Sequence, residues 1–134
     1  MDRPIGYWLK HLDRLIESAM DQAFAREGVT RRHWQILNTL RTAPHDEPGL
    51  TEALRPFWGT AGITLAEVMT DLTSRGWVTG HYELTPTGET AHAAIQEKVH
   101  QIRERFLTGL TTDDYRRTVD TLRHMAENLE SSLA

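Results

Sequence analysis

LAEVMTDLTSRGWVTGHYELTPTGETAHAA, residues 65–94, is the stretch of sequence that decides the fold. Thr64 and Glu67 have the spacing of a capping box at the start of a helix. The apolar residues that follow recur on one helical face, and they are Leu65, Val68, Met69 and Leu72. Gly76 is expected to end this helix. The first half of the segment therefore predicts a short amphipathic helix.

The second half predicts a hairpin and the start of another helix. Residues 77–79 and 82–85 contain β-formers, and Gly80 with His81 can make a tight turn between two short strands. Thr85 and Pro86 then supply an N-cap hydroxyl and a proline at the first helical position, where its missing N–H costs nothing. A helix, a short hairpin and a second helix in this order outline a winged helix.

Length and composition indicate one domain, residues 1–134, with a modest core. The chain has no cysteine, which excludes disulfides, thiolate zinc sites and a cysteine nucleophile, and is compatible with a reducing compartment. No apolar run approaches membrane-spanning length, and the first residues, MDRPIGYWLKHLDR, are charged where a signal peptide needs an apolar stretch. We expect a cytoplasmic protein that does not associate with a membrane.

The rest of the chain predicts a mainly α fold of six helices around the single hairpin, without internal repeats. The other predicted helices run from Ile5 to about Arg26, from Thr30 past Leu40, around Leu50 and Leu54 with truncation or a kink at Pro56, from Pro86 to about Leu107, and from near Thr112 onward. A loop of turn-forming residues is expected between Ala43 and Gly49.

Three of these helices are long and lie outside the central winged-helix lobe, residues 30–95. Because this lobe is too small to cover their apolar faces, residues 1–27 and 96–134 are expected to form a helical dimerisation region. The expected dimer interface consists of Ile5, Trp8, Leu9, Phe106, Leu107, Leu110, Tyr115, Leu122 and Leu129. An intramolecular three-helix bundle built from the same residues is the alternative.

The order of the elements resembles the MarR family of bacterial transcription regulators over nearly the whole chain. The matching segments are GVTRRHWQILNTL at residues 28–40, LTSRGWVTG at 72–80 and YELTPTGETAHAAI at 82–95. The resemblance implies a winged-helix homodimer that binds a pseudo-palindromic operator in double-stranded DNA. It also implies a small aromatic or anionic effector that releases the DNA from a crevice between the dimer helices and the DNA-binding lobe.

The resemblance places DNA contacts on the helix after Thr64 and on its neighbours, where hydroxyls and arginines can meet phosphates or base edges. The candidate residues are Arg55, Thr60, Thr64, Glu67, Thr70, Arg75 and His81. The sequence departs from the family at Ala66, where a hydroxyl is common, and at Glu67, where a basic residue is common. Glu67 can serve the capping box instead, or accept a hydrogen bond from a cytosine amino group.

The wing is short and the lobe is acidic. Only residues 79–81 link the expected strands, whereas family wings carry an aspartate and arginines in a long loop that enters the minor groove. Residues 45–80 contain two arginines against five carboxylates, a formal charge of −3. Because counterion release supplies most non-specific affinity, generic DNA should bind poorly. Cations at the edge of the lobe, Arg31, Arg32 and Arg41, could add to Arg55 and Arg75.

Two hypotheses follow, and fold alone does not separate them. The first is an operator-binding regulator with a weakly basic reading head. The second is a winged-helix dimer that has lost DNA binding and acts through a small ligand or a protein partner. The first is favoured because a few local cations suffice and dimerisation doubles every contact.

A ligand crevice is the second expectation that the resemblance carries. The residues that map to it are Trp8, His11, Leu15, His33, Trp34 and Trp58. His11 or His33 could hydrogen-bond a carboxylate or a phenol, whereas Trp34 is better explained as core. Exposed histidines and packed tryptophans without a ligand are an equally good interpretation.

No catalytic or metal-binding constellation is found in the sequence. It contains no Gly-rich phosphate loop after a strand and no HExxH motif, and His92 and His100 lie two helical turns apart, too far for one metal ion. Asp113 and Asp114 stand where a helix N-terminus favours acidic residues. We expect neither an enzyme nor a cofactor.

Overall fold

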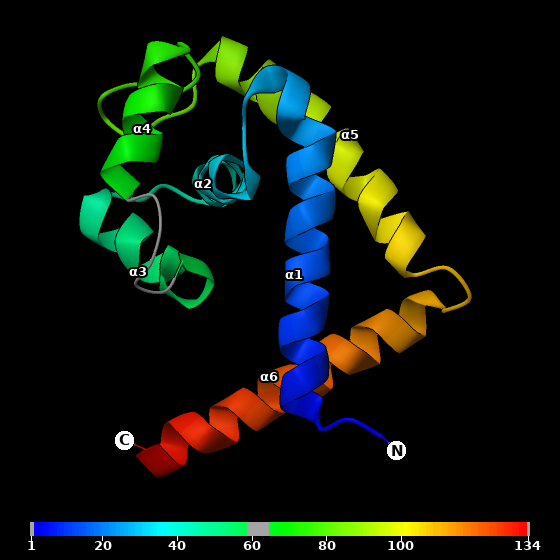
Figure 1. Cartoon of the computed structure of the whole chain (residues 1–134). Helices are drawn as coiled ribbons and strands as arrows, with labels where there is room; N and C mark the ends of the chain where they lie inside the picture. Colours follow the sequence, from blue (N-terminus) through cyan, green and yellow to red (C-terminus); the bar gives the residue numbers. More distant parts are fainter. Residues whose placement is uncertain (1, 59–64, 134) are drawn as a thin grey trace. The chain divides into compact units, whose positions relative to one another are not determined.

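The computed structural model describes residues 2–58 and 65–133, which form six α-helices and one turn of 3₁₀-helix (Figure 1). The helices are α1 (Ile5–Phe24), η1 (Ala25–Glu27), α2 (Arg31–Thr42), α3 (Glu47–Trp58), α4 (Leu65–Ser74), α5 (Pro86–Phe106) and α6 (Thr112–Leu133). All six predicted α-helices are therefore present. No helix in the described ranges is long and apolar enough to cross a membrane.

The chain divides into two compact units, residues 1–102 and residues 103–134. The first unit holds α1 to α4, the hairpin and most of α5, and α2 is its central helix because it packs against α1, α3 and α4. The largest fully buried side chains are Phe24, Ile36, Leu37, Leu50, Leu72, His92, Val68 and Val78. Burial of these residues at helical spacing is what holds the unit together.

The ends of three helices are set by the signals that the sequence predicts. The Thr30 hydroxyl accepts from the backbone N–H of Arg32 at 3.2 Å and caps α2. The Thr85 hydroxyl accepts from the N–H of Gly88 at 2.9 Å at the start of α5. Gly28 follows α1 and η1 in the left-handed conformation, with φ of 68°. These predicted boundaries are confirmed.

The prediction for α3 is wrong at its start, and of the truncation or kink expected at Pro56 the truncation does not occur. The helix begins at Glu47, inside the expected loop, because Asp46 caps it: its carboxylate accepts from the N–H of Gly49 at 2.9 Å. It also continues past Pro56 to Trp58 instead of stopping there. Pro56 lies in the last turn, so its missing N–H removes one hydrogen bond near an end that would fray in any case.

The hairpin is shorter than predicted. One antiparallel bridge, Val78 to Leu84, stands in place of two strands. The turn is closed by the N–H of Tyr82, which donates to the carbonyl of Thr79 at 3.2 Å, and Tyr82 has a positive φ of 61°. The five residues between the paired positions form the turn, so little chain is left for a ladder.

The second unit consists of the last turn of α5, a short connection and α6. In α6, among residues 112–133, no side chain is buried within the analysed chain. Arg123 pairs on the same helix with Asp120 at 3.2 Å. The apolar residues of α6 therefore lie at the surface of the single chain, and none of them is buried against another element.

Candidate nucleic-acid interface

α4 and the turn of the hairpin together line a shallow cavity of about 430 Å³. The lining residues are Glu47, Leu65, Ala66, Met69, Thr70, Thr73, Ser74, Thr79, Gly80 and Tyr82. Most of the polar groups in this set are hydroxyls, and Thr70, Thr73 and Ser74 are exposed on one side of α4. This is the surface that the sequence analysis assigns to DNA.

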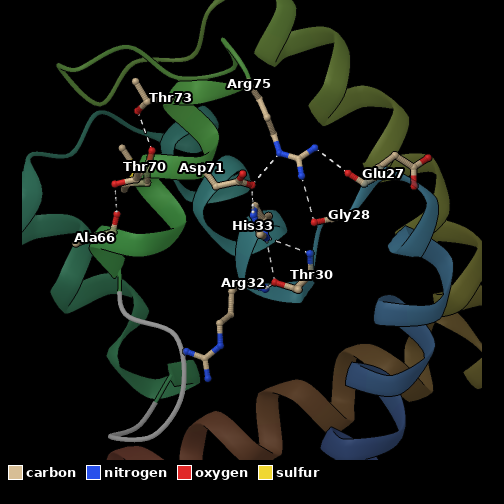
Figure 2. Close-up of polar contacts among 11 residues, drawn as sticks. Glu27, Gly28, Thr30, Arg32, His33, Ala66, Thr70, Asp71, Thr73 and Arg75 are labelled. Atoms are coloured by element: carbon tan, nitrogen blue, oxygen red, sulfur yellow. Dashed lines mark hydrogen bonds and ion pairs between the residues drawn. The ribbon is translucent and has the colours of Figure 1, made fainter.

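The threonine hydroxyls of α4 donate to their own helix. Thr70 Oγ1 donates to the carbonyl of Ala66 at 2.8 Å, and Thr73 Oγ1 donates to the carbonyl of Met69 at 2.8 Å (Figure 2). Because each hydroxyl hydrogen is used, each oxygen is left as an acceptor on the exposed face. Groups that donate hydrogen bonds, such as base amino groups, fit this face better than phosphates do.

Arg75 is half-buried and bound to other groups of the first unit. Its Nε donates to Asp71 Oδ2 at 2.8 Å, its Nη1 to the carbonyl of Glu27 at 2.7 Å and its Nη2 to the carbonyl of Gly28 at 3.2 Å (Figure 2). The guanidinium also lies 5.1 Å from the centre of the Trp77 ring. The phosphate contact expected for Arg75 therefore competes with three hydrogen bonds inside the protein.

His33 connects α2 to α4. Its Nδ1 accepts from the N–H of Thr30 at 3.1 Å, so the ring proton of the neutral imidazole lies on Nε2, which donates to Asp71 Oδ2 at 2.8 Å. The side chain is buried, and burial lowers the pKa of His33 although Asp71 opposes the shift. Both ring nitrogens are occupied, so this geometry does not support the ligand contact expected for His33.

The pKa of the neighbouring carboxylate, Asp71, is also lowered, which favours its charged form. The hydrogen bond from Arg75 lowers the pKa of Asp71, with a smaller contribution from His33, while burial opposes the shift. Asp71 therefore accepts two hydrogen bonds, one from the guanidinium of Arg75 and one from the imidazole of His33. Asp71 is one of the five carboxylates behind the formal charge of −3 over residues 45–80, so charge alone indicates only repulsion of phosphates.

Other cations of the first unit are also paired with carboxylates. Arg55 lies 2.9 Å from Glu52 on the exposed side of α3, within one helical turn. Arg31 pairs with Asp13, Arg41 with Glu89 and Lys98 with Glu27, at 2.7, 3.2 and 2.6 Å. These pairs reduce the positive potential that a phosphate backbone would meet.

His81 is exposed at the hairpin turn, where its backbone N–H donates to the hydroxyl of Thr79 at 3.2 Å. Next to it, burial and then the neighbouring charge of Glu47 on α3 raise the pKa of Tyr82. Tyr82 and Glu47 line the same cavity, so the turn lies beside the start of α3. Thr60 and Thr64, with the capping box expected at Thr64, lie outside the described residues.

The residues expected to line a ligand crevice fall into two groups. Trp8 and Leu15 are exposed on α1, and the His11 ring stacks with Tyr7 at 5.5 Å. Trp34 and Trp58 belong to the lobe: Trp34 stacks on His92 at 5.0 Å, and Trp58 Nε1 donates to Gln35 at 2.8 Å. The Arg32 guanidinium lies 4.9 Å from the centre of the Trp58 ring. Packing thus accounts for both lobe tryptophans.

The residues expected at a dimer interface are mostly exposed on the single chain. The exposed large apolar side chains include Ile5, Trp8, Leu9, Leu110 and Leu129. Phe106, Leu107, Tyr115 and Leu122 are half-buried. Leu107 and Tyr115 also line a cavity of about 390 Å³ within the second unit, together with Arg103, Thr112, Arg116, Val119 and Asp120.

Comparison with known proteins identifies the fold. Residues 29–94 match the family described as the winged helix DNA-binding domain. The MarR family protein Rv2887 of Mycobacterium tuberculosis, solved in complex with DNA, is similar with a TM-score of 0.72 and 22% identity, over 90% of this chain and 98% of that one.

Two further structures agree. The transcriptional regulator PA3341 is similar with a TM-score of 0.77 and 22% identity, over 96% of this chain and 99% of that one. Rv2887 in complex with salicylic acid gives a TM-score of 0.71 and 23% identity, over 92% of this chain and 99% of that one. The predicted MarR-type winged-helix fold is confirmed.

Proposed function

We propose that this chain, which has the MarR-type fold with a winged-helix DNA-binding domain at residues 29–94, is a transcription regulator that binds operator DNA as a homodimer. The observation that carries the proposal is the exposed hydroxyl face of α4, next to the hairpin turn and clear of the core. In a winged helix this is the face that enters the major groove. A similar protein, Rv2887, was solved in complex with DNA.

The exposed face of α4 contacts bases more through hydroxyl oxygens that accept hydrogen bonds than through cations. Thr70 and Thr73 keep their oxygens available for amino groups, which adenine and cytosine present in the major groove. Thr70→Val keeps the shape of the side chain and removes the hydroxyl, so it should change which operator variants are preferred. Equal loss of affinity for every sequence would contradict a role in base reading.

The test of DNA binding is a fluorescence-anisotropy titration against DNA flanking the gene, repeated over a series of salt concentrations. Because few cations on the lobe are unpaired with carboxylates, we expect a shallow slope of log affinity against log salt, about −2 to −4 for a dimer. Glu52→Gln should strengthen binding and steepen the slope, since it releases Arg55 from its 2.9 Å pair. Absence of binding at low salt would overturn the regulator proposal.

The homodimer is supported by unpartnered apolar helices at both ends of the chain. Trp8 on α1 is 54% exposed and Leu129 on α6 is 62% exposed, and several neighbours on each helix are similar. Contiguous apolar stripes of this kind are typical of an interface between subunits. Two copies also match the two half-sites of a pseudo-palindromic operator.

A small aromatic acid is the effector that we propose. Tyr7 and Trp8 form an exposed aromatic pair on α1 with centroids 5.1 Å apart, and the Arg3 guanidinium lies 4.7 Å from the Tyr7 ring centre. Aromatic faces beside a cation suit a benzoate-like ligand, and Rv2887 was solved with salicylic acid. Salicylate at millimolar concentration should raise the melting temperature, and Trp8→Ala should reduce the shift. No shift in the wild type would count against this effector.

A second function is favoured by one observation, the pairing of Arg31, Arg41, Arg55 and Arg75 with carboxylates. A winged-helix dimer with its cations neutralised in this way would act through a ligand or a protein partner without binding DNA. The salt series separates the two functions, because this second one gives no binding even at the lowest ionic strength.

A further inference from the structure

One carboxylate, Asp71, joins α4 to two other parts of the first unit. Its Oδ2 accepts from Nε2 of His33 on α2 at 2.8 Å and from Nε of Arg75 at the end of α4 at 2.8 Å (Figure 2). Arg75 in turn donates to the carbonyls of Glu27 and Gly28, which follow α1. The chain of contacts from Thr30 through His33 and Asp71 to Arg75, here named the relay, therefore fixes both the N-terminus of α2 and the end of α1 to α4.

His33 performs two tasks in the relay. It is the third residue of α2 and completes a capping box, because its Nδ1 accepts from the N–H of Thr30 at 3.1 Å. Glu or Gln at that position is enough for such a box. The imidazole has a second nitrogen on the other side of the ring, and this one reaches Asp71, 38 residues away in the sequence. Capping alone does not call for histidine; capping and a bond to α4 together do.

Asp71 is an unfavourable residue for a DNA-reading helix unless it has another role. A carboxylate on α4 repels the phosphate backbone, and the lobe already carries a formal charge of −3 over residues 45–80. We propose that His33, Asp71 and Arg75 are positioning residues that hold α4 in the orientation that DNA binding requires. This inference rests on the proposed function, but it also predicts a property of the free protein.

Acid should weaken the relay. The charged and titratable groups that face His33 are Asp71 on α4 and Arg75 directly after α4, and Thr30 caps the helix of His33 itself. Protonation of Nδ1 would place an N–H against the N–H of Thr30 and remove the acceptor of the capping box. Burial lowers the pKa of His33 below that of a free histidine, so the neutral ring persists to a lower pH than a free imidazole would.

The first test compares His33→Gln with the wild type. Glutamine retains the capping box but has no second group to reach Asp71, so the melting temperature should stay within a few degrees. We expect affinity for the tightest-binding fragment to fall about ten-fold, the value for loss of one charge-assisted hydrogen bond. Protonation of His33 removes the acceptor of the wild-type cap, so wild-type affinity should fall more than that of the variant as the pH is lowered below the ordinary range of histidine. Wild-type affinity and an unchanged pH profile in His33→Gln would overturn the proposal.

The second test distinguishes a positioning role of Asp71 from simple repulsion of phosphates. Asp71→Asn removes a negative charge from α4, so simple phosphate repulsion predicts tighter binding, whereas a positioning role predicts about ten-fold weaker binding to the same fragment. Glu83→Gln is the matched control: it removes the same charge from an exposed side chain of the hairpin, away from the relay. Tighter binding by both variants would contradict the proposal.

A third measurement needs no DNA. Amide hydrogen exchange over residues 65–74 should be faster in His33→Gln and in Asp71→Asn than in the wild type, because α4 loses an anchor. Unchanged exchange in both variants would show that the relay does not hold α4. If the wild type binds no DNA, the proposed function fails and the DNA part of this inference fails with it, while exchange still decides whether the relay positions the helix.

Discussion

The indole of Trp34 stacks on the imidazole of His92, with ring centroids 5.0 Å apart and planes 20° from parallel. His92 is 2% exposed, and its Nε2 lies 3.2 Å from Asn38 Oδ1. Because that amide oxygen can only accept, Nε2 carries the ring proton. Burial lowers the pKa of His92, and nearby Arg41 lowers it further. The pair links α2 to α5 through a neutral histidine.

Stability should therefore decrease in acid. His33 and His92 both have pKa values lowered by burial in the folded chain, whereas unfolded histidine titrates near 6.5. The unfolded state binds more protons below that pH, so the contribution is complete above it and is lost as the pH falls. We expect the free energy of unfolding, measured by urea titration, to decline from pH 7 to pH 5. His92→Phe keeps the stack and should reduce this decline; an identical profile would contradict the assignment.

Among the glycines in residues 2–58 and 65–133, Gly88 is the one where a side chain is least tolerable. A Cβ there would overlap the carbonyl of Trp77, which is backbone and cannot rotate away. Gly88→Ala should therefore lower stability by about 2 kcal/mol or more, as overpacking does. Gly80→Ala is the control, because nothing lies within 4 Å of its added Cβ, and it should change stability by less than about 0.5 kcal/mol. Equal melting temperatures for the two variants would refute this close contact.

Local signals predicted the helix ends well. Thr30, Gly28 and Thr85 act within three residues of the backbone groups they satisfy, so their effect can be read from a short stretch of sequence. The predicted start of α3 is wrong because Asp46 stands in a run of turn-forming residues, although an aspartate is also an N-cap signal. The predicted strands are too long because Tyr82 has a positive φ, which a tyrosine rarely adopts and which the sequence therefore does not indicate.

Long-range contacts could not be predicted. In the sequence, Arg75 and Asp71 appear as separate charges near the DNA-binding face. In the structure they form an ion pair, and Arg75 also donates to backbone carbonyls 47 and 48 residues away. His33 was a ligand candidate because its type suggested it, and its partner Asp71 lies 38 residues away. Residue spacing within one helix indicates neither the Arg75 contacts nor the His33–Asp71 contact, because only tertiary packing brings α1, α2 and α4 together.

The apolar stripe of α6 should control dimerisation. Leu129→Lys replaces a side chain that is 62% exposed on the single chain, and the lysine favours the helix C-terminus, so the monomer should stay folded. At a two-fold interface the substitution acts twice, and we expect the dimer dissociation constant to rise at least ten-fold in sedimentation equilibrium. His124→Lys lies on the opposite side of the helix by its spacing and should leave the dimer intact. An unaffected dimer in Leu129→Lys would place the interface elsewhere.

The hairpin should contribute little to DNA binding. Its turn is short, residues 79–82, and Tyr82 lines a cavity together with Glu47 of α3, so the turn lies against the lobe. A wing that reads the minor groove needs a longer loop that carries arginine. We expect a minor-groove ligand such as netropsin to leave the complex intact, whereas methylation of guanine N7 in the major groove should weaken it. His81→Ala should change affinity less than Thr70→Val does. Displacement by netropsin, with a large loss of affinity in His81→Ala, would show that the wing reads the minor groove after all.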